Sequence, residues 1–154
     1  MPDTPEARPV DLSGNVLGFD FGKRLIGVAV GNRLTGARAL STVDHGDTEP
    51  DWRRIDALIS EWRPACLIVG LPLSLDGNEQ PMSRAARAFG AALEARYALA
   101  IQFVDERHTS NEAARRFAAR RAEGKARRKD AAALDAIAAE IILESWLAEG
   151  PTHA

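Results

Sequence analysis

The run from Cys66 to Val69 constrains the fold of this chain more than any other segment, because it is apolar at every position and is bounded by Gly70 and Pro72. A strand with one face in water alternates apolar and polar residues, whereas a continuous apolar run is expected of a strand that is buried on both faces. The chain has 154 residues, which is enough for one domain to bury such a strand without disulfides or a structural metal. We therefore expect a single α/β domain.

Apolar runs and helical spacings on either side of this strand give the order of the other elements. Before it, short apolar runs predict strands over about 16–19, 25–30 and 38–43, the first two joined by the turn-forming residues 20–24. A helix is expected next, because Thr48 and Asp51 have capping-box spacing and Pro50 falls in the first turn. Pro64 ends this helix, and its apolar positions at helical spacing are Trp52, Ile55, Leu58, Ile59 and Trp62.

After the buried strand, a polar loop over 74–80 leads into a helix expected over about 83–97, followed by a strand over 101–104. Thr109 and Glu112 again have capping-box spacing and open a helix to about 122, and a last helix is expected over about 130–148. Strands joined by tight turns should pair antiparallel, and strands separated by helices should join them in parallel. The predicted fold is a mixed five-stranded sheet, with three antiparallel strands and then parallel ones, flanked by helices.

Acidic residues stand at the ends of these elements. Asp20 and the pair Asp105-Glu106 each follow an apolar strand, at the carboxyl ends where such sheets bind ligands, and Asp135 lies inside an alanine-rich helix. Ionised carboxylates near a packed core are costly unless they are compensated, and a cation is a common compensator. If these acids converge, we expect a divalent-metal site of the kind that cuts phosphodiesters.

Each acid also has a simpler interpretation. Asp20 followed by Gly22 is ordinary turn chemistry, and Asp105-Glu106 is an ordinary polar exit from a strand ahead of a helix. Asp135 is harder to explain in this way, because its neighbours three and four residues away are all alanine, and such a face lets a helix approach a sheet closely. The alternative is a solvated Asp135 beside an apolar stripe of Leu134, Ile137 and Ile141.

Basic residues are concentrated in one segment, although the formal net charge of the chain is −2. Eight basic residues and the single acid Glu123 lie between Arg115 and Lys129, which leaves +7 in that segment. Arginine dominates this set and suits planar contacts to phosphate. Beside a carboxylate cluster, the segment favours nucleic-acid binding over its alternative, a solvated helical face followed by a flexible loop.

Several other classes of protein are excluded by composition. The single Cys66 cannot form an intramolecular disulfide, and no cysteine and histidine spacing typical of zinc sites is present. No apolar stretch approaches the roughly 18 residues of a membrane span, so we expect a cytoplasmic protein. Residues 1–14 read as a flexible leader and 15–149 as the domain. Of the three histidines, only His108 lies near the expected site, where it could contact substrate, but a surface position at a helix entry explains it better.

Four ordered motifs together resemble the bacterial YqgF/RuvX family, and the resemblance spans about Val16 to Leu147. The motifs are Asp20-Phe21-Gly22 with Ile26-Gly27-Val28-Ala29-Val30; Val69-Gly70-Leu71-Pro72-Leu73 with Asp76-Gly77; Asp105-Glu106-Arg107 with Thr109-Ser110; and Asp135 six residues before Ile141-Ile142-Leu143-Glu144-Ser145. Members are described as Holliday-junction resolvases and as the nuclease that matures the 5′ end of pre-16S ribosomal RNA. The chain departs from the family pattern at His108 and Leu25, which bears on substrate preference.

The resemblance implies a ribonuclease-H-like fold and catalytic acids at Asp20, Glu106 and Asp135, which would bind Mg²⁺ or Mn²⁺, with Asp105 as a further candidate ligand. Two ions about 3.5 to 4 Å apart would activate a water for attack on phosphorus and stabilise the leaving 3′ oxygen. We expect a hydrolase, a metal-dependent endonuclease that acts on pre-rRNA or branched DNA and that could form a homodimer. The candidate nucleic-acid-binding residues are Arg24, Arg107, Arg120, Arg121, Arg127 and Arg128.

Two rival functions follow from the same residues. An Asp-x-Gly turn after a strand also occurs in phosphotransferases of the actin/hexokinase class, but that class normally needs two such domains around a nucleotide cleft. A non-catalytic RNA-binding scaffold would keep the fold and the basic segment without cleavage. Binding of ATP would reveal the first, and absence of metal-dependent cleavage the second.

Overall fold

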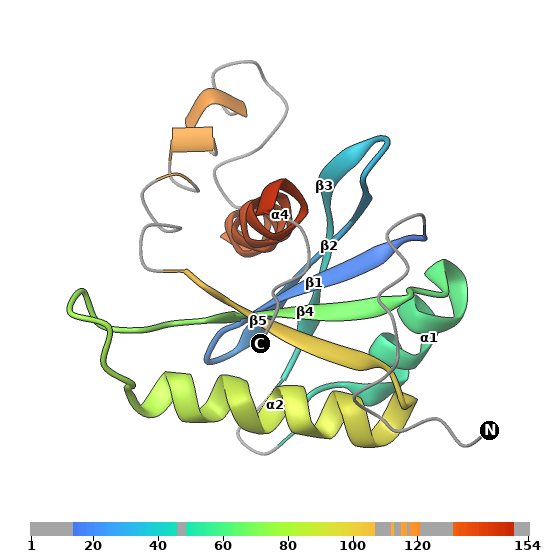
Figure 1. Cartoon of the computed structure of the whole chain (residues 1–154), viewed down its shortest axis with the longest axis horizontal. Helices are drawn as coiled ribbons and strands as arrows, with labels where there is room; N and C mark the ends of the chain where they lie inside the picture. The colour runs from blue at the N-terminus through green and yellow to red at the C-terminus, as the bar shows by residue number, and fades with distance from the viewer. Residues whose placement is uncertain are drawn as a thin grey trace.

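The structure is a computed structural model that describes residues 14–45, 49–106, 112, 115, 116, 118–120 and 131–149 (Figure 1). It contains five strands, β1 (Val16–Phe21), β2 (Leu25–Asn32), β3 (Gly36–Asp44), β4 (Cys66–Leu71) and β5 (Ala100–Asp105). The helices with defined bounds are α1 (Trp52–Trp62), α2 (Pro81–Tyr97) and α4 (Ala131–Glu149). The leader, residues 107–111 and the centre of the basic segment lie outside the described residues.

The strands form one sheet in the order β3-β2-β1-β4-β5. β1 pairs antiparallel with β2 and β2 with β3, whereas β1 pairs parallel with β4 and β4 with β5. This is the mixed five-stranded sheet that the sequence predicts. Because β1, β4 and β5 run in the same direction, their carboxyl ends meet at one edge of the sheet.

Helices cover both faces of this sheet, with α1 and α2 on one face and α4 on the other (Figure 1). Successive residues of a strand point to opposite faces, so β4 supplies Leu67 and Val69 to the α1/α2 side and Cys66 and Ile68 to the α4 side. All four side chains are fully buried. The double burial confirms the strand predicted from the continuous apolar run.

Two helix starts differ from the predicted ones. The N-cap of α1 is Asp51, whose carboxylate accepts a hydrogen bond from the backbone N of Arg54, and Pro50 lies before the helix and not in its first turn. Helix α2 begins at Pro81 and not at Ser83, because Gln80 and Ser83 form a reciprocal capping box. In both cases the capping hydrogen bond joins a side chain to a backbone N–H three residues away in the sequence. The sequence contained more than one pair of residues with that spacing.

α4 lies unusually close to the sheet, because the strands present glycine beneath it. A Cβ atom at Gly18 would lie 3.1 Å from the Cβ of Leu143, and one at Gly27 would lie 1.9 Å from the backbone O of Asp135. The second contact is shorter than any real Cβ contact, so only glycine permits the observed position of the helix. Across the described part of the chain, no helix is long and apolar enough to span a membrane.

Candidate active site

The alternation of side chains along β1 places Asp20 on the face of the sheet that α4 covers. Val16 and Gly18, which precede Asp20 at intervals of two residues, both contact α4. Asp20 also stands directly opposite Gly27 in the β1–β2 register, and directly opposed residues share a face. The backbone of α4 at Asp135 packs on that same Gly27. Asp20 and Asp135 are thus brought together by a single glycine.

Glu106 reaches the same face from the end of β5. Its backbone N donates to the O of Leu71 at 3.2 Å, which continues the β4–β5 pairing by one residue. Its carboxylate lies directly over Gly70, since a Cβ at Gly70 would approach Glu106 Oε2 to 2.3 Å and Ile142 Cδ1 to 2.4 Å. The missing side chain at Gly70 therefore forms the space that the Glu106 carboxylate occupies between β4 and α4.

The electrostatics of this cluster are dominated by the burial of its acids. Burial is the largest effect on Glu106 and, together with the charge of Asp20 and a hydrogen bond between the two carboxyl groups, raises its pKa to about 9. The pKa of Asp20 rises to about 6, through burial opposed by that hydrogen bond and reinforced by the charge of Asp135. Burial also raises the pKa of Asp135. Without a cation, burial and mutual repulsion therefore favour retention of a proton by the pair Asp20 and Glu106.

The donor set fits a hard divalent cation. Glu106 Oε2 is buried and has no hydrogen-bond partner among the described residues, which is costly unless a ligand supplies one. Carboxylate oxygens are the ligands that Mg²⁺ and Mn²⁺ prefer. Among the described residues, no group of three or more aspartate, glutamate, histidine or cysteine side chains that could hold a metal ion is present. Asp20 and Glu106 therefore form the two-carboxylate centre of the candidate site.

Asp105 differs from Glu106 although the two residues are adjacent. It is exposed, and the alternation along β5 places it on the same side as Phe103, which packs against the α1/α2 core. Its negative charge nevertheless contributes to the raised pKa of Glu106. Geometry thus selects Glu106 over Asp105 as the partner of Asp20.

The turn after Asp20 is held by a histidine that the sequence analysis assigned no role. The ring of His45 stacks on Phe21 with centroids 4.7 Å apart, and its Nε2 contacts the backbone O of Gly22. Gly22 in turn donates its N–H to the O of Leu25 at 3.0 Å. These contacts fix the Asp20 turn on the side away from α4. The signal available in the sequence was the position of His45 directly after the predicted strand over 38–43.

The candidate nucleic-acid-binding arginines fall into three groups. Arg24 is exposed in the turn that follows Asp20, at the edge where the acids gather. Arg120 is paired internally, with its Nη2 3.0 Å from Oε2 of the buried Glu140. Arg107, Arg121, Arg127 and Arg128, as well as His108, lie outside the described residues.

Glu140 has other partners besides Arg120. Arg116 bridges Glu140 at 2.8 Å and Glu144 at 2.7 Å, and the backbone N of Ala39 in β3 donates to Glu140 Oε1 at 2.8 Å. The side chain of Glu140 is 4% exposed as part of α4, so these bonds compensate a buried charge. The described residues of the helical segment from 112 to 120 are tied in this way to α4, the helix that carries Asp135.

Comparison with known proteins identifies the chain's relatives. A protein from Xanthomonas euvesicatoria pv. vesicatoria, named "Putative pre-16S rRNA nuclease", is 52% identical over 145 residues, which is 94% of each chain. A protein of the same name from Xanthomonas campestris pv. campestris (strain B100) is 51% identical over 144 residues, 93% of each chain. Both relatives match the present chain over nearly its whole length.

Solved structures confirm the fold. RuvC from Thermus thermophilus superposes with a TM-score of 0.52 at 18% identity, covering 88% of this chain and 96% of RuvC. The same enzyme in complex with a Holliday junction gives a TM-score of 0.50 at 20% identity, covering 89% and 96%. The ribonuclease-H-like fold implied by the resemblance is therefore confirmed. The model of one family, described as RuvX: Holliday junction resolvase, matches residues 14–149, and the chain belongs to this family of nucleases.

Proposed function

We propose that this protein is a divalent-metal-dependent endonuclease, formed by one domain over residues 15–149, that processes the 5′ end of pre-16S rRNA in the cytoplasm. The observation that carries the proposal is the pair Asp20 and Glu106 on the α4 face of the sheet, where the Glu106 carboxylate lies over Gly70 and burial raises the pKa of both acids. The names of the relatives supply the substrate class.

In this proposal Asp20, Glu106 and Asp135 hold the metal, with Asp105 as an outer contributor of negative charge. When bound, Mg²⁺ or Mn²⁺ supplies an activated water and stabilises charge on the scissile phosphate. The residues of the chain itself hold these carboxylates close together and partly shield them from water. Gly70 and Gly27 have no side chains, and the space that results lets the Glu106 carboxylate and the α4 backbone approach the sheet. Burial raises the pKa of Glu106, so the metal-free cluster retains a proton that a bound cation would replace.

The test compares substrates under one set of conditions. The purified protein is incubated with 5′-extended 16S precursor RNA and with a four-way DNA junction, in Mn²⁺ or in EDTA. We expect metal-dependent cleavage of the RNA at the mature 5′ end. Preferential cleavage of the junction would favour the alternative that the family description suggests, a Holliday junction resolvase. Binding of RNA without cleavage of either substrate would instead indicate a scaffold. Precursor ends in cells with and without the protein give the independent check.

Asp135 is tested through thermal stability. If its carboxylate belongs to the cluster, Asp135→Ala should relieve repulsion in the metal-free protein, so its melting temperature should stay equal or rise. The additional stabilisation by Mn²⁺ should shrink, because one ligand is lost and a ligand stabilises only the state that binds it. Melting curves with Mn²⁺ and with EDTA at one pH measure both effects. An undiminished Mn²⁺ shift would remove Asp135 from the site.

The basic segment is proposed to grip the phosphate backbone, together with Arg24 and Arg107. Replacing Arg121, Arg127 and Arg128 by Gln should weaken RNA binding and reduce its salt dependence by roughly 0.7 log units per lost contact. Arg120→Gln is the matched comparison, because Arg120 pairs with Glu140 and should affect thermal stability more than the salt slope. Equal salt slopes for wild type and the triple variant would argue against a role in binding.

A further inference from the structure

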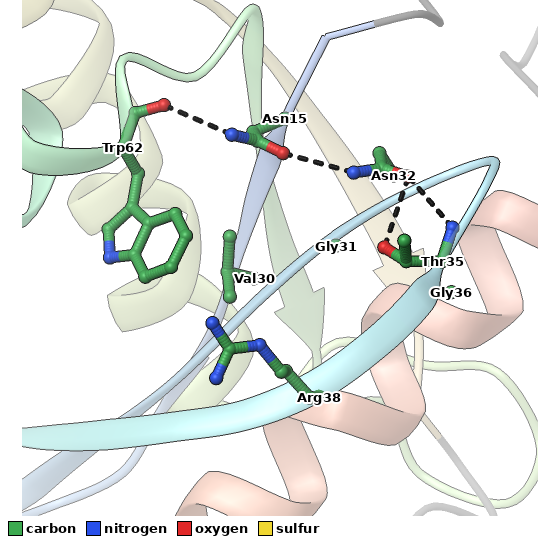
Figure 2. A pocket seen from close by; sticks show the side chains of 8 residues that line it. All are labelled: Asn15, Val30, Gly31, Asn32, Thr35, Gly36, Arg38 and Trp62. Carbon is green, nitrogen blue, oxygen red and sulfur yellow. Dashed lines mark hydrogen bonds between the residues drawn. The ribbon is translucent and has the colours of Figure 1, made fainter.

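A cavity of about 280 Å³ opens at the edge of the sheet opposite the acidic cluster (Figure 2). It lies between the start of β1, the β2–β3 turn and the end of α1, and is lined by Asn15, Val30, Gly31, Asn32, Thr35, Gly36, Arg38 and Trp62. Five residues separate Asn15 from Asp20, which at the rise of a strand is about 16 Å. The cavity is therefore a separate feature of the molecule and takes no part in the site described above.

One wall of the cavity is polar and already fixed. The amide of Asn32 donates from Nδ2 to Asn15 Oδ1 at 3.1 Å, and its Oδ1 accepts from the backbone N and the hydroxyl of Thr35 at 2.9 and 3.1 Å (Figure 2). Asn15 Nδ2 donates to the backbone O of Trp62 at 3.5 Å. These bonds hold the side chains in place without a ligand. Asn15 keeps a second amide hydrogen for which no acceptor is recorded among the described residues.

The charged group of the cavity is Arg38. Its guanidinium carbon lies over the Trp62 ring, 5.2 Å from the ring centroid, and this cation–π contact holds the charged group at the cavity. Within the described part of the chain, the arginines that pair with carboxylates are Arg87, Arg96, Arg115, Arg116 and Arg120, and Arg38 is not one of them. None of the eight lining residues is acidic.

A guanidinium held over an aromatic ring, beside an amide and with no acidic residue in the cavity lining, has the donors that bind a phosphate group. We propose that this cavity binds a phosphate ester, with Arg38 as the principal contact and Asn15 as a second donor. The cavity has room for more than the phosphate, and the guanidinium and Trp62 offer planar surfaces to an attached base. The phosphate could come from a free nucleotide or from the backbone of a nucleic acid. The inference does not depend on the proposed nuclease function.

The experiment measures binding in EDTA with the Asp20→Asn variant as background, so that the acidic cluster contributes no metal-dependent affinity. The probes are inorganic phosphate, adenosine 5′-monophosphate and a short single-stranded RNA, followed by tryptophan fluorescence and calorimetry. Arg38→Gln should weaken the responding probe about tenfold or more, and Arg38→Lys should restore it only in part, because lysine lacks the fork. Arg53→Gln, which removes an exposed charge from α1, is the matched control.

The outcomes separate the two sources of the phosphate. Loss of adenosine 5′-monophosphate binding in Arg38→Gln alone supports a free nucleotide. If Arg38→Gln loses affinity only for RNA, and the slope of log affinity against log salt falls by roughly 0.7, the result supports a single contact to the RNA backbone. Equal affinities of the Asp20→Asn parent and of its Arg38→Gln and Arg53→Gln derivatives for all three probes would overturn the proposal. Because cleavage is not measured, failure here leaves the nuclease proposal intact, and absence of cleavage by the wild type leaves this one intact.

Discussion

Asp20→Asn is expected to abolish metal-dependent cleavage while leaving the fold intact. The amide keeps the size and shape of the side chain at the end of β1, but it removes the charge of the residue that links Glu106 and Asp135 electrostatically. Changes at groups that merely orient metal ligands already cost roughly 10 to 100-fold in activity or affinity, so loss of a ligand should exceed about 100-fold. Cleavage rates in Mn²⁺, with a circular dichroism spectrum and a melting curve for folding, test this expectation.

Asp105→Asn is the matched control for this result. It makes the same chemical change at a neighbouring carboxylate that is exposed and directed to the other face of the sheet. Its effect should be small and should arise from the loss of a nearby negative charge, which would lower the pKa of Glu106 slightly. Full activity of Asp20→Asn would contradict the proposed site. Equal and large losses in both variants would show that both carboxylates bind metal.

Much of the fold could be predicted because strand patterns and turns are local features. The continuous apolar run of β4 indicated burial on both faces, and the turn at 20–24 indicated an antiparallel hairpin, and both are present. The helix starts were less predictable, since Thr48, Asp51, Gln80 and Ser83 all have side chains that can cap. Which of them caps depends on where the preceding loop directs the chain, and the sequence pattern does not contain that information.

The candidate site was predictable only as a set of acids, not as an arrangement. Asp105 and Glu106 both follow a strand, and their side chains point to opposite faces, so the choice depends on which face α4 covers. Two glycines determine this arrangement, because they are the places where α4 and the Glu106 carboxylate approach the sheet. Gly27 and Gly70 are conspicuous within apolar strands, but their role as contact points for Asp135 and Glu106 requires the register and the helix position. His45 was missed because only the β2–β3 register, in which Asp44 pairs with Leu25, places it beside the Asp20 turn.

Glu106→Gln should change the pH dependence of stability in the metal-free protein. A carboxyl group whose pKa is raised on folding, here from 4.5 to about 9, binds its proton more tightly in the folded state. Between those two values the folded state therefore holds more protons than the unfolded state, and stability falls as the pH rises. Glutamine cannot ionise and keeps an amide hydrogen for Asp20, so most of this fall should disappear, leaving a smaller one due to Asp20 itself below about pH 6.

The size of the effect follows from the linkage. Each pKa unit corresponds to about 1.4 kcal/mol, so even a third of the shift should make Glu106→Gln more stable than wild type by about 2 kcal/mol at pH 8.5, or roughly 5 °C in melting temperature. Below about pH 4, where the Glu106 carboxyl group is neutral in both the folded and the unfolded state, the two proteins should melt together. Added Mn²⁺ should reverse the order at pH 8.5, because only the wild type gains a ligand for the cation. Parallel pH profiles of the two proteins in EDTA would mean that Glu106 is solvated and that the carboxylate pair does not exist in solution.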